Sequence, residues 1–277
     1  MNSSRDAVPE GHRFAFGENW ASYARLVTQR QIDDAAAALR RLLGDELHGK
    51  RFLDIGCGSG LHALAALRLG AVEVVAIDVD RKSVETARKM LETHAAGKAW
   101  RVLEKSVFDL DASDIGRFDV VYSWGVLHHT GDMHRALRIG ATLVAPGGLF
   151  VFALYRRTSL CWFWKVEKRW YSGAGPFGQT VARSIFVGLF RAVFPVLKRR
   201  SFRQYVKEYS DRRGMDFYHD VHDWLGGWPY ESISAADVQR FMGGIGMGEV
   251  RTIARSRDRT GLFGSGCDEY VYAAITS

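Results

Sequence analysis

The residues best suited to chemistry lie in one short stretch, where an aspartate is followed by three closely spaced glycines. Asp54 stands two residues before Gly56, and Gly58 and Gly60 follow at alternate positions. Glycine allows left-handed backbone conformations and lets a ligand approach the main chain closely. A carboxylate at this point repels a phosphate but attracts a cation, such as the ammonium group of an amino acid. The stretch therefore predicts a site for a ligand that carries a positive charge.

The spacing of these glycines separates two kinds of nucleotide site. Dinucleotide-binding turns read G-x-G-x-x-G, which places a pyrophosphate on the N-terminus of the following helix. Here the glycines follow G-x-G-x-G within LDIGCGSG. In this motif the chain resembles the class I S-adenosylmethionine (SAM)-dependent methyltransferases, whose first motif has much the same form. The resemblance implies SAM as the cofactor and S-adenosylhomocysteine as the product.

Two further acidic residues follow the next two apolar runs. Asp78 ends the run Val72–Asp78, and Asp109 follows the run Trp100–Lys105. In nucleotide-binding α/β folds a carboxylate at the first position accepts hydrogen bonds from ribose hydroxyls. In the resembling family the position of Asp109 accepts from the adenine amine, and Phe108 beside it would cover the ring. The alternative for Asp109 is an ordinary loop acid.

The fourth apolar run leads into WGVLHHTGDM, at the point where such sheets bind ligands. His129, and less so His128, could remove a proton from an acceptor, because an ordinary histidine pKa is about 6.5. Either could equally form a hydrogen bond within the loop. The resemblance also implies that Trp124 and Gly125 pass beside the cofactor. The predicted cofactor-binding residues are Asp54, Gly56, Cys57, Gly58, Gly60, Asp78, Val79, Phe108, Asp109, Trp124 and Gly125.

Apolar periodicity predicts the elements that position these residues. Asp80 is expected to cap the helix that follows it, and Ser234 with Asp237 to form a capping box. The predicted strands are Phe52–Ile55, Val72–Asp78, Trp100–Lys105, Phe118–Ser123, Leu149–Leu154, Glu249–Arg255 and Asp268–Ile275, and the predicted helices are Leu61–Leu69, Arg81–Thr93, Thr130–Leu143 and Ser234–Met242. The last two strands follow one another, which favours an antiparallel hairpin.

Apolar residues at helical spacing run from about Asn19 to Gly44. In the resembling family, N-terminal helices often close over the cofactor and help to form the acceptor pocket. Trp20 and Tyr23 could therefore line that pocket, since an aromatic ring attracts a cation such as a sulfonium. The alternative is that these aromatic residues only dock the helix on the core.

A long insert departs from a minimal methyltransferase. Between Arg156 and Arg213 there are fourteen Lys and Arg residues against three acidic residues, and this region accounts for the net charge of +7. An insert of this length predicts a helical cap over the active site. Its basic and aromatic surface could serve nucleic acid, an anionic membrane surface or a small acceptor in a closed pocket. A solvated helix face with an apolar inner side is the fourth interpretation. For a lipid-linked acceptor, Phe190 and Phe194 are the side chains expected to meet the lipid.

The end of the insert, GMDFYHDVHDWLGGWPYE, has the composition of a rigid functional loop. His219 and His222 lack a convincing further ligand, so no metal site is predicted. Proton removal or substrate positioning is expected of His222 and Asp223, and with His129 these are the predicted catalytic residues. The predicted substrate-binding residues are Trp20, Tyr23, His128, His219, Trp224, Trp228 and Tyr230.

Composition restricts the compartment and the class. The three cysteines form no C-x-x-C pair, which argues against a disulfide framework or a zinc site. The first residues lack a signal-peptide pattern, and the apolar run Val181–Leu197 is too short for a span, carries Arg191 and contains Pro195. A cytoplasmic protein is therefore expected, with at most interfacial contact with a membrane.

The predicted fold class is α/β, a Rossmann-like seven-stranded class I methyltransferase sheet with N-terminal helices and a helical cap inserted after the fifth strand. The expected divisions are an N-terminal helical segment (1–48), a SAM-binding core (49–155), the cap (156–232) and a C-terminal helix with two strands (233–277). The predicted activity is methyl transfer to a small organic acceptor, with O-methylation favoured. The alternatives are a tRNA or rRNA methyltransferase, a membrane-associated enzyme for a lipid-linked acceptor, and a SAM-binding protein without activity.

Overall fold

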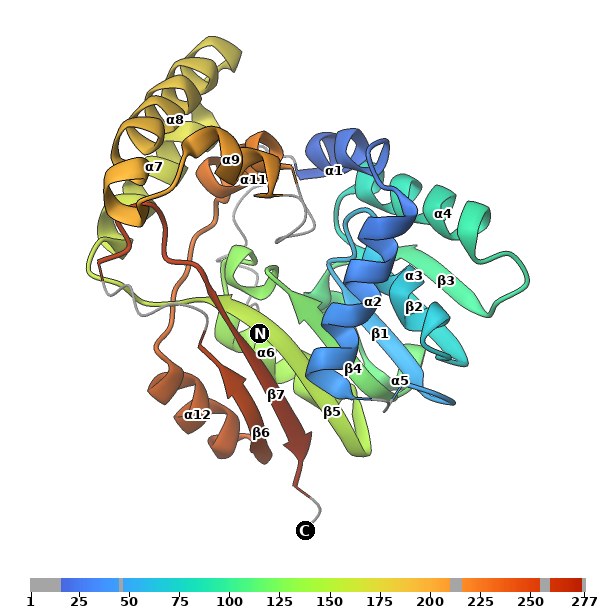
Figure 1. Ribbon diagram of the computed structural model, residues 1–277. Helices are drawn as coiled ribbons and strands as arrows, with labels where there is room; N and C mark the ends of the chain where they lie inside the picture. The colour runs from blue at the N-terminus through green and yellow to red at the C-terminus, as the bar shows by residue number, and fades with distance from the viewer. Residues whose placement is uncertain (1–15, 45–46, 210–215, 255–259, 276–277) are drawn as a thin grey trace.

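A seven-stranded sheet forms the centre of the computed structural model, which describes residues 16–44, 47–209, 216–254 and 260–275 (Figure 1). The strand order is β3-β2-β1-β4-β5-β7-β6. Only β7 runs antiparallel to its two neighbours. In chain order the strands are β1 (Arg51–Ile55), β2 (Glu73–Asp78), β3 (Trp100–Glu104), β4 (Phe118–Trp124), β5 (Val144–Tyr155), β6 (Met247–Ile253) and β7 (Cys267–Ala274).

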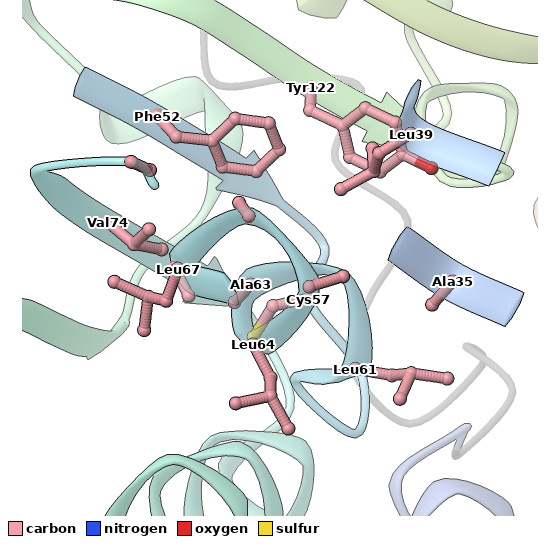
Figure 2. Packing of buried hydrophobic residues seen from close by; sticks show 14 of the residues in the cluster. Ala35, Leu39, Phe52, Cys57, Leu61, Ala63, Leu64, Leu67, Val74 and Tyr122 are labelled. Atoms are coloured by element: carbon pink, nitrogen blue, oxygen red, sulfur yellow. The ribbon is translucent and has the colours of Figure 1, made fainter. Parts of the chain in front are cut away.

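Helices cover both faces of the sheet. The first face carries α2 (Gln29–Leu43), α3 (Leu61–Arg68) and α4 (Arg81–His94), and the second carries α5 (Ala112–Ile115), α6 (Met133–Thr142) and α12 (Ala235–Gly244). Each face has its own apolar core. Figure 2 shows part of the first core, to which α2 contributes Ala35 and Leu39, α3 contributes Leu61, Ala63, Leu64 and Leu67, and the strands contribute Phe52, Val74 and Tyr122.

The first strand, turn and helix fit tightly together. The apolar residues of β1 are fully buried, and α3 is buried along most of its circumference. Gly60 begins α3 with φ of 78°. A Cβ at Gly60 would lie 2.9 Å from both Cα and Cβ of Ala87 in α4. This glycine therefore allows both the left-handed turn and the close approach of the two helices.

The insert after β5 folds as a group of helices. These are α7 (Cys161–Gly173), α8 (Pro176–Lys198), α9 (Phe202–Lys207) and α11 (Phe217–Gly226), which stand together beyond the end of β5 (Figure 1). They share an aromatic core that includes Trp164, Tyr171 and Phe217. The predicted fold class, with its N-terminal helices and helical cap, is confirmed. Over the described ranges, no helix is both long enough and apolar enough to cross a membrane.

The two ends of the cap meet at the sheet. The N–H of Ile233 donates to the carbonyl of Tyr155, and the N–H of Arg157 donates to the carbonyl of Ile233, each at 3.0 Å. Nearby, Nε of Arg156 donates to Oδ2 of buried Asp268 at 2.9 Å. These contacts hold the entry and the exit of the cap against the core.

The predicted N-terminal helices are α1 (Phe16–Ala24) and α2, and Thr28 begins the second with a capping box. Three other elements differ from their predictions. Asp132 caps α6, which starts later than predicted, and β5 extends back through the Pro146–Gly148 segment to Val144. The expected rigid loop at 216–226 is the helix α11, whose N-cap Asp216 accepts from two main-chain N–H groups.

Replacing Gly60 with Ala should destabilise the fold beyond the general penalty for a left-handed alanine. That penalty is roughly 1–2 kcal/mol, and overpacking against α4 should add roughly 1–3 kcal/mol. Gly97 is the matched control, because its φ is 77° and a Cβ there would meet nothing within 4 Å. Thermal unfolding should show a larger fall in Tm for Gly60→Ala than for Gly97→Ala. Equal falls would contradict the packing argument.

Candidate active site

The glycine turn after β1 is built onto the end of β2. The main-chain N–H groups of Gly56 and Cys57 both donate to the carbonyl of Ile77, at 2.8 and 2.9 Å. The N–H of Gly58 donates to Oδ2 of Asp78 at 3.0 Å. The carboxylate of Asp78 therefore fixes the shape of the turn from the neighbouring strand.

The second oxygen of Asp78 binds the next turn. The N–H of Asp80 donates to Oδ1 of Asp78 at 2.9 Å, and Asp80 in turn caps α4 by accepting from the N–H of Ser83. The predicted cap at Asp80 is confirmed. Burial raises the pKa of Asp78. Each carboxylate oxygen has two lone pairs, so both can still accept a ligand hydroxyl.

Asp54 is the least satisfied group of this site. Its side chain is 3% exposed, and Oδ2 has no hydrogen-bond partner among the described residues. Burial, and then the nearby charge of Asp78, raise the pKa of Asp54 to about 7. A buried carboxylate oxygen without a donor fits the N–H groups of a cation. The residues present therefore suit the ammonium group of SAM.

The third predicted acid lies farther out. Asp109 belongs to η2 (Val107–Asp109), which follows β3, and its side chain is exposed. Phe108 is half-buried, and the guanidinium of Arg135 lies 4.7 Å from its ring centroid. Val79 is also exposed. The parallel strands β2 and β3 bring this segment to the same edge as Asp78, so the adenine role stays a prediction that this placement allows.

The end of β4 brings an aromatic residue towards the same edge. Trp124 Nε1 donates to Oε1 of Glu269 at 3.0 Å, and Arg41 pairs with the same buried carboxylate at 3.2 Å. Gly125 follows with φ of 77°. The strand order reverses between β1 and β4, which is the point where ligands bind in sheets of this kind.

Helix α1 contacts both the glycine turn and the cap. A Cβ at Gly58 would lie 3.0 Å from the ring of Trp20. Phe16 lies 5.4 Å from His129 between ring centroids, and Nδ2 of Asn19 donates to the main-chain carbonyl of His219 in α11 at 3.1 Å. Trp20 therefore covers the glycine turn. Tyr23 is buried in the first core.

His128, in the loop after β4, is buried and neutral. Its Nδ1 accepts from the N–H of Tyr155 at 3.3 Å, so the ring proton is on Nε2, which has no partner among the described residues. Burial, and then the charges of His129 and Lys168, hold its pKa well below the ordinary value. The ring packs on Tyr155 with centroids 3.8 Å apart.

His129 fastens the loop after β4, η3 (Leu127–His129), to the end of the cap. Its Nδ1 lies 2.7 Å from the carbonyl oxygen of Pro229, and since a carbonyl only accepts, Nδ1 is the donor. Burial lowers the pKa of His129 to about 4. A Cβ at Gly227 would lie 2.5 Å from Cε1 of the ring. The imidazole is thus neutral at pH 7 and clamped in place.

The two cap histidines have partners of their own. His222 Nδ1 lies 2.8 Å from the hydroxyl of Tyr171, inside the cap, and burial lowers its pKa to about 4. His219 lies between Asp216 at 2.9 Å and Oγ of Ser22 at 3.0 Å, which joins α11 to α1. Within the described ranges no group of three His, Cys, Asp or Glu side chains is placed to hold a metal ion.

The other predicted cap residues gather near η3. Asp223 has a buried Oδ1 without a hydrogen-bond partner among the described residues, and burial raises its pKa well above the ordinary value. Trp224 packs edge-on against Tyr155 with centroids 5.1 Å apart. The hydroxyl of Tyr230 contacts Cys161 Sγ and Ser265 Oγ, while half-buried Trp228 packs on the cap core with its ring centroid 5.9 Å from the guanidinium carbon of Arg169.

Sequence reasoning missed Lys168 and Asn19. Lys168 is fully buried, and its Nζ lies 3.6 Å from the ring centroid of Trp224. Trp164, Lys168 and Tyr171 are the buried residues of α7, at the spacing of one helix face. A lysine on the apolar stripe of an amphipathic helix was therefore the available signal.

Comparison with known proteins identifies the family. A family model described as "Methyltransferase domain" matches residues 27–236. The ubiquinone biosynthesis O-methyltransferase of Caulobacter sp. (strain K31) is 40% identical over 112 residues, or 40% of this chain and 42% of that protein. The enzyme of the same description from Proteus mirabilis (strain HI4320) is 34% identical over 119 residues, or 43% of this chain and 47% of that protein. The matches thus span less than half of the length of these curated relatives.

Solved structures share the fold. Magnesium protoporphyrin IX methyltransferase from Synechocystis PCC 6803, with bound S-adenosylhomocysteine, has a TM-score of 0.51 at 18% identity, over 88% of this chain and 82% of that chain. The 1,6-didemethyltoxoflavin-N1-methyltransferase of Burkholderia thailandensis has a TM-score of 0.51 at 15% identity, over 89% and 79%. The cyclase SpnF has a TM-score of 0.53 at 13% identity, over 88% and 81%. The fold thus serves more than one reaction.

The family match covers both the glycine turn and the whole of the cap, and the strand order and the carboxylates at the sheet edge agree with it. The chain therefore belongs to the class I SAM-dependent methyltransferase family.

Proposed function

We propose that this chain transfers the methyl group of SAM to a small organic acceptor, with an oxygen atom favoured as the nucleophile. The observation that carries the proposal is the buried Oδ2 of Asp54, which has no hydrogen-bond partner among the described residues and lies beside Asp78 at the glycine turn. When bound, SAM supplies a methyl group on a positively charged sulfur. The ubiquinone relatives are O-methyltransferases by description, and this likeness supports oxygen.

The core residues would hold and orient the cofactor. Asp54 would accept from its ammonium group, and Asp78 would accept from its ribose hydroxyls while it keeps the N–H of Gly58 in place. Phe108 and Asp109 would meet the adenine. Holding a donor and an acceptor in line can by itself supply a large part of the rate enhancement.

The acceptor would lie between η3, α1 and the cap. Asp223 is the best-placed proton acceptor, because its Oδ1 is buried and unpartnered among the described residues. A carboxyl whose pKa is raised by burial is also a stronger base than an ordinary carboxylate. His129 would act as a positioning residue, because its Nδ1–H donates to Pro229 and its lowered pKa makes Nε2 a weak base. His222 would act within the cap, since it is bonded to Tyr171.

The proposed activity is tested by the formation of S-adenosylhomocysteine with a panel of acceptors. The panel holds catechols, aromatic amines, short-chain quinols and bulk tRNA. We expect acceptor-dependent product with phenolic compounds and none with tRNA. Product with tRNA alone would replace the small-molecule assignment with the RNA alternative. A folded protein that binds SAM but gives no product with any acceptor would favour the inactive binding protein.

Replacing Asp223 with Asn should lower kcat by roughly 10²–10⁴-fold, the contribution expected of a general base. The affinity for SAM should stay unchanged. Because the base must be ionised, wild-type activity should rise with pH through the raised pKa of Asp223, and the variant should lose this rise. Asp220→Asn is the control, since Asp220 accepts from the hydroxyl of Tyr209. Equal loss in both variants would contradict the assignment.

A second feature favours an acceptor taken from a membrane surface. The outer side of α8 exposes Phe177, Ile185 and Leu189, which are 84%, 58% and 58% exposed, and α7 exposes Trp162 and Trp170. The inner side of α8 is also apolar, because Phe186 and Phe190 pack against the cap core and buried Phe194 stacks on Phe190. Because α8 has apolar side chains on both sides, its outer face is expected to be buried against another molecule or a membrane.

Charge indicates which cover suits this face. Helix α8 contains no acidic residue, and Lys165, Arg169 and Arg191 are exposed on α7 and α8. An apolar stripe with flanking cations fits the interface of an anionic bilayer. We propose that the outer face of α7 and α8 rests on such a surface. Phe190 and Phe194, expected to meet the lipid, instead pack against Tyr205 of α9 inside the cap, so that expectation is wrong.

Co-sedimentation with vesicles tests the membrane proposal. Wild-type protein should bind phosphatidylcholine vesicles that contain phosphatidylglycerol, and more weakly those without it or at high salt. The triple variant Phe177→Ser, Ile185→Ser and Leu189→Ser should lose binding. Val250→Ser, which changes an exposed apolar residue of β6, is the control. Unchanged binding of the triple variant, or no binding of the wild type, would overturn the proposal.

A further inference from the structure

Lys168 is a buried lysine that has no role in the proposed methyl transfer. It comes from the inner face of α7 and is 0% exposed. Its Nζ has no hydrogen-bond partner among the described residues. Instead it lies 3.6 Å from the ring centroid of Trp224 and 5.5 Å from that of Tyr230. An ammonium group has three donors, and aromatic faces satisfy none of them by an ordinary hydrogen bond.

Two further donors in the same cluster also lack an acceptor. Nε1 of Trp224 and Nε2 of His128 are both buried without a partner among the described residues. Trp224 contacts Lys168 directly, and His128 is close enough for the lysine charge to lower its pKa. Tyr155 packs against both Trp224 and His128. These N–H groups, which lack an acceptor among the described residues, belong to side chains that contact one another or share Tyr155 as a neighbour. Buried donors of this kind indicate that an oxygen-bearing ligand supplies an acceptor.

The charged and titratable groups around Lys168 influence its protonation state. Glu167 precedes it on α7, His128 and His129 face it from η3, and Asp223 precedes Trp224 on α11. Burial lowers the pKa of Lys168 to about 7, against the opposing pull of Glu167. An anionic ligand would restore the charged ammonium, because opposite charges attract strongly in a buried site.

Glu167 does not serve as the missing partner. Both of its carboxylate oxygens are buried and have no hydrogen-bond partner among the described residues. Adjacent residues of a helix point in directions about 100° apart, so the two side chains leave α7 on different sides. Burial raises the pKa of Glu167 to about 7, so it carries only part of a charge at neutral pH.

We propose that Lys168, with Trp224 and His128, forms a subsite for an anionic oxygen on an aromatic acceptor. Nζ of Lys168 would donate to the oxygen, and the rings of Trp224, Tyr155 and Tyr230 would bound the flat ring that carries it. The inference rests on the proposed function and names its substrate class. The oxygen belongs either to an aryl carboxylate, which would anchor the acceptor, or to the ionised hydroxyl that receives the methyl group.

The subsite is tested by equilibrium binding, without turnover, to protein saturated with S-adenosylhomocysteine. The probes are 3,4-dihydroxybenzoate, its uncharged amide and aniline. Binding of S-adenosylhomocysteine itself is measured first, and its absence would count against the proposed function rather than the subsite. If the subsite binds an aryl carboxylate, the benzoate should bind the wild type at least about tenfold more tightly than the amide. A tenfold difference in affinity corresponds to about 1.4 kcal/mol. If the subsite binds the ionised hydroxyl, the benzoate and its amide should bind with equal affinity, and both should bind more tightly than aniline.

Variants separate the subsite from a packing role. Lys168→Met should remove the preference for the oxygen-bearing probes, and Lys168→Arg should keep part of it, while both variants keep their affinity for S-adenosylhomocysteine. Lys165→Met, on the exposed side of the same helix, should behave as the wild type. Unchanged probe affinities in Lys168→Met, or no binding of any probe to the wild type, would overturn the subsite. A Lys168→Met protein that no longer binds S-adenosylhomocysteine would do the same, since the lysine would then act on the fold.

Discussion

The proposed cofactor site depends on two carboxylates at the ends of neighbouring strands, buried Asp54 and half-buried Asp78. Asp78 meets its need for donors with the main chain, because it accepts from the glycine turn and from the turn that begins α4. Asp54 remains with one oxygen unpartnered among the described residues, and the charge of Asp78 adds to its burial. Such a pair is expensive to ionise unless a cation lies beside it. The fold therefore holds a site whose electrostatic balance improves when a positively charged ligand binds.

The proposed acceptor site is joined to this core through a few contacts. Trp20 covers the glycine turn, and on the same helix Asn19 donates to the main-chain carbonyl of His219 in the cap. The cap enters and leaves the core beside Tyr155, whose ring packs on His128. Residues that are far apart in the chain thus meet at one end of the sheet. The cap therefore contacts both the proposed acceptor site and helix α1, which carries Trp20 over the glycine turn.

The sequence was informative where function depends on local structure. Asp54, the glycines and Asp78 lie within one strand-turn-helix unit and the next strand, so spacing alone placed them correctly at one sheet edge. It was less informative where packing decides. The segment with His222 and Asp223 was expected as a loop, but Asp216 caps it as a helix. Lys168 looked like one more charge in a basic insert, and Phe190 and Phe194 looked exposed, because the face that each presents depends on the other cap helices.

The central claim is tested most directly by the affinity for SAM as a function of pH, measured by calorimetry for the wild type and for Asp54→Asn. Because burial holds the pKa of free Asp54 at about 7 and a cation favours the ionised form, wild-type affinity should rise as the pH increases from about 5.5 and level off above about 8. The Asn variant should bind at least about tenfold more weakly at the higher pH and lose most of this dependence. Equal affinity and equal pH dependence in the two proteins would show that Asp54 does not meet the cofactor, and would contradict the account.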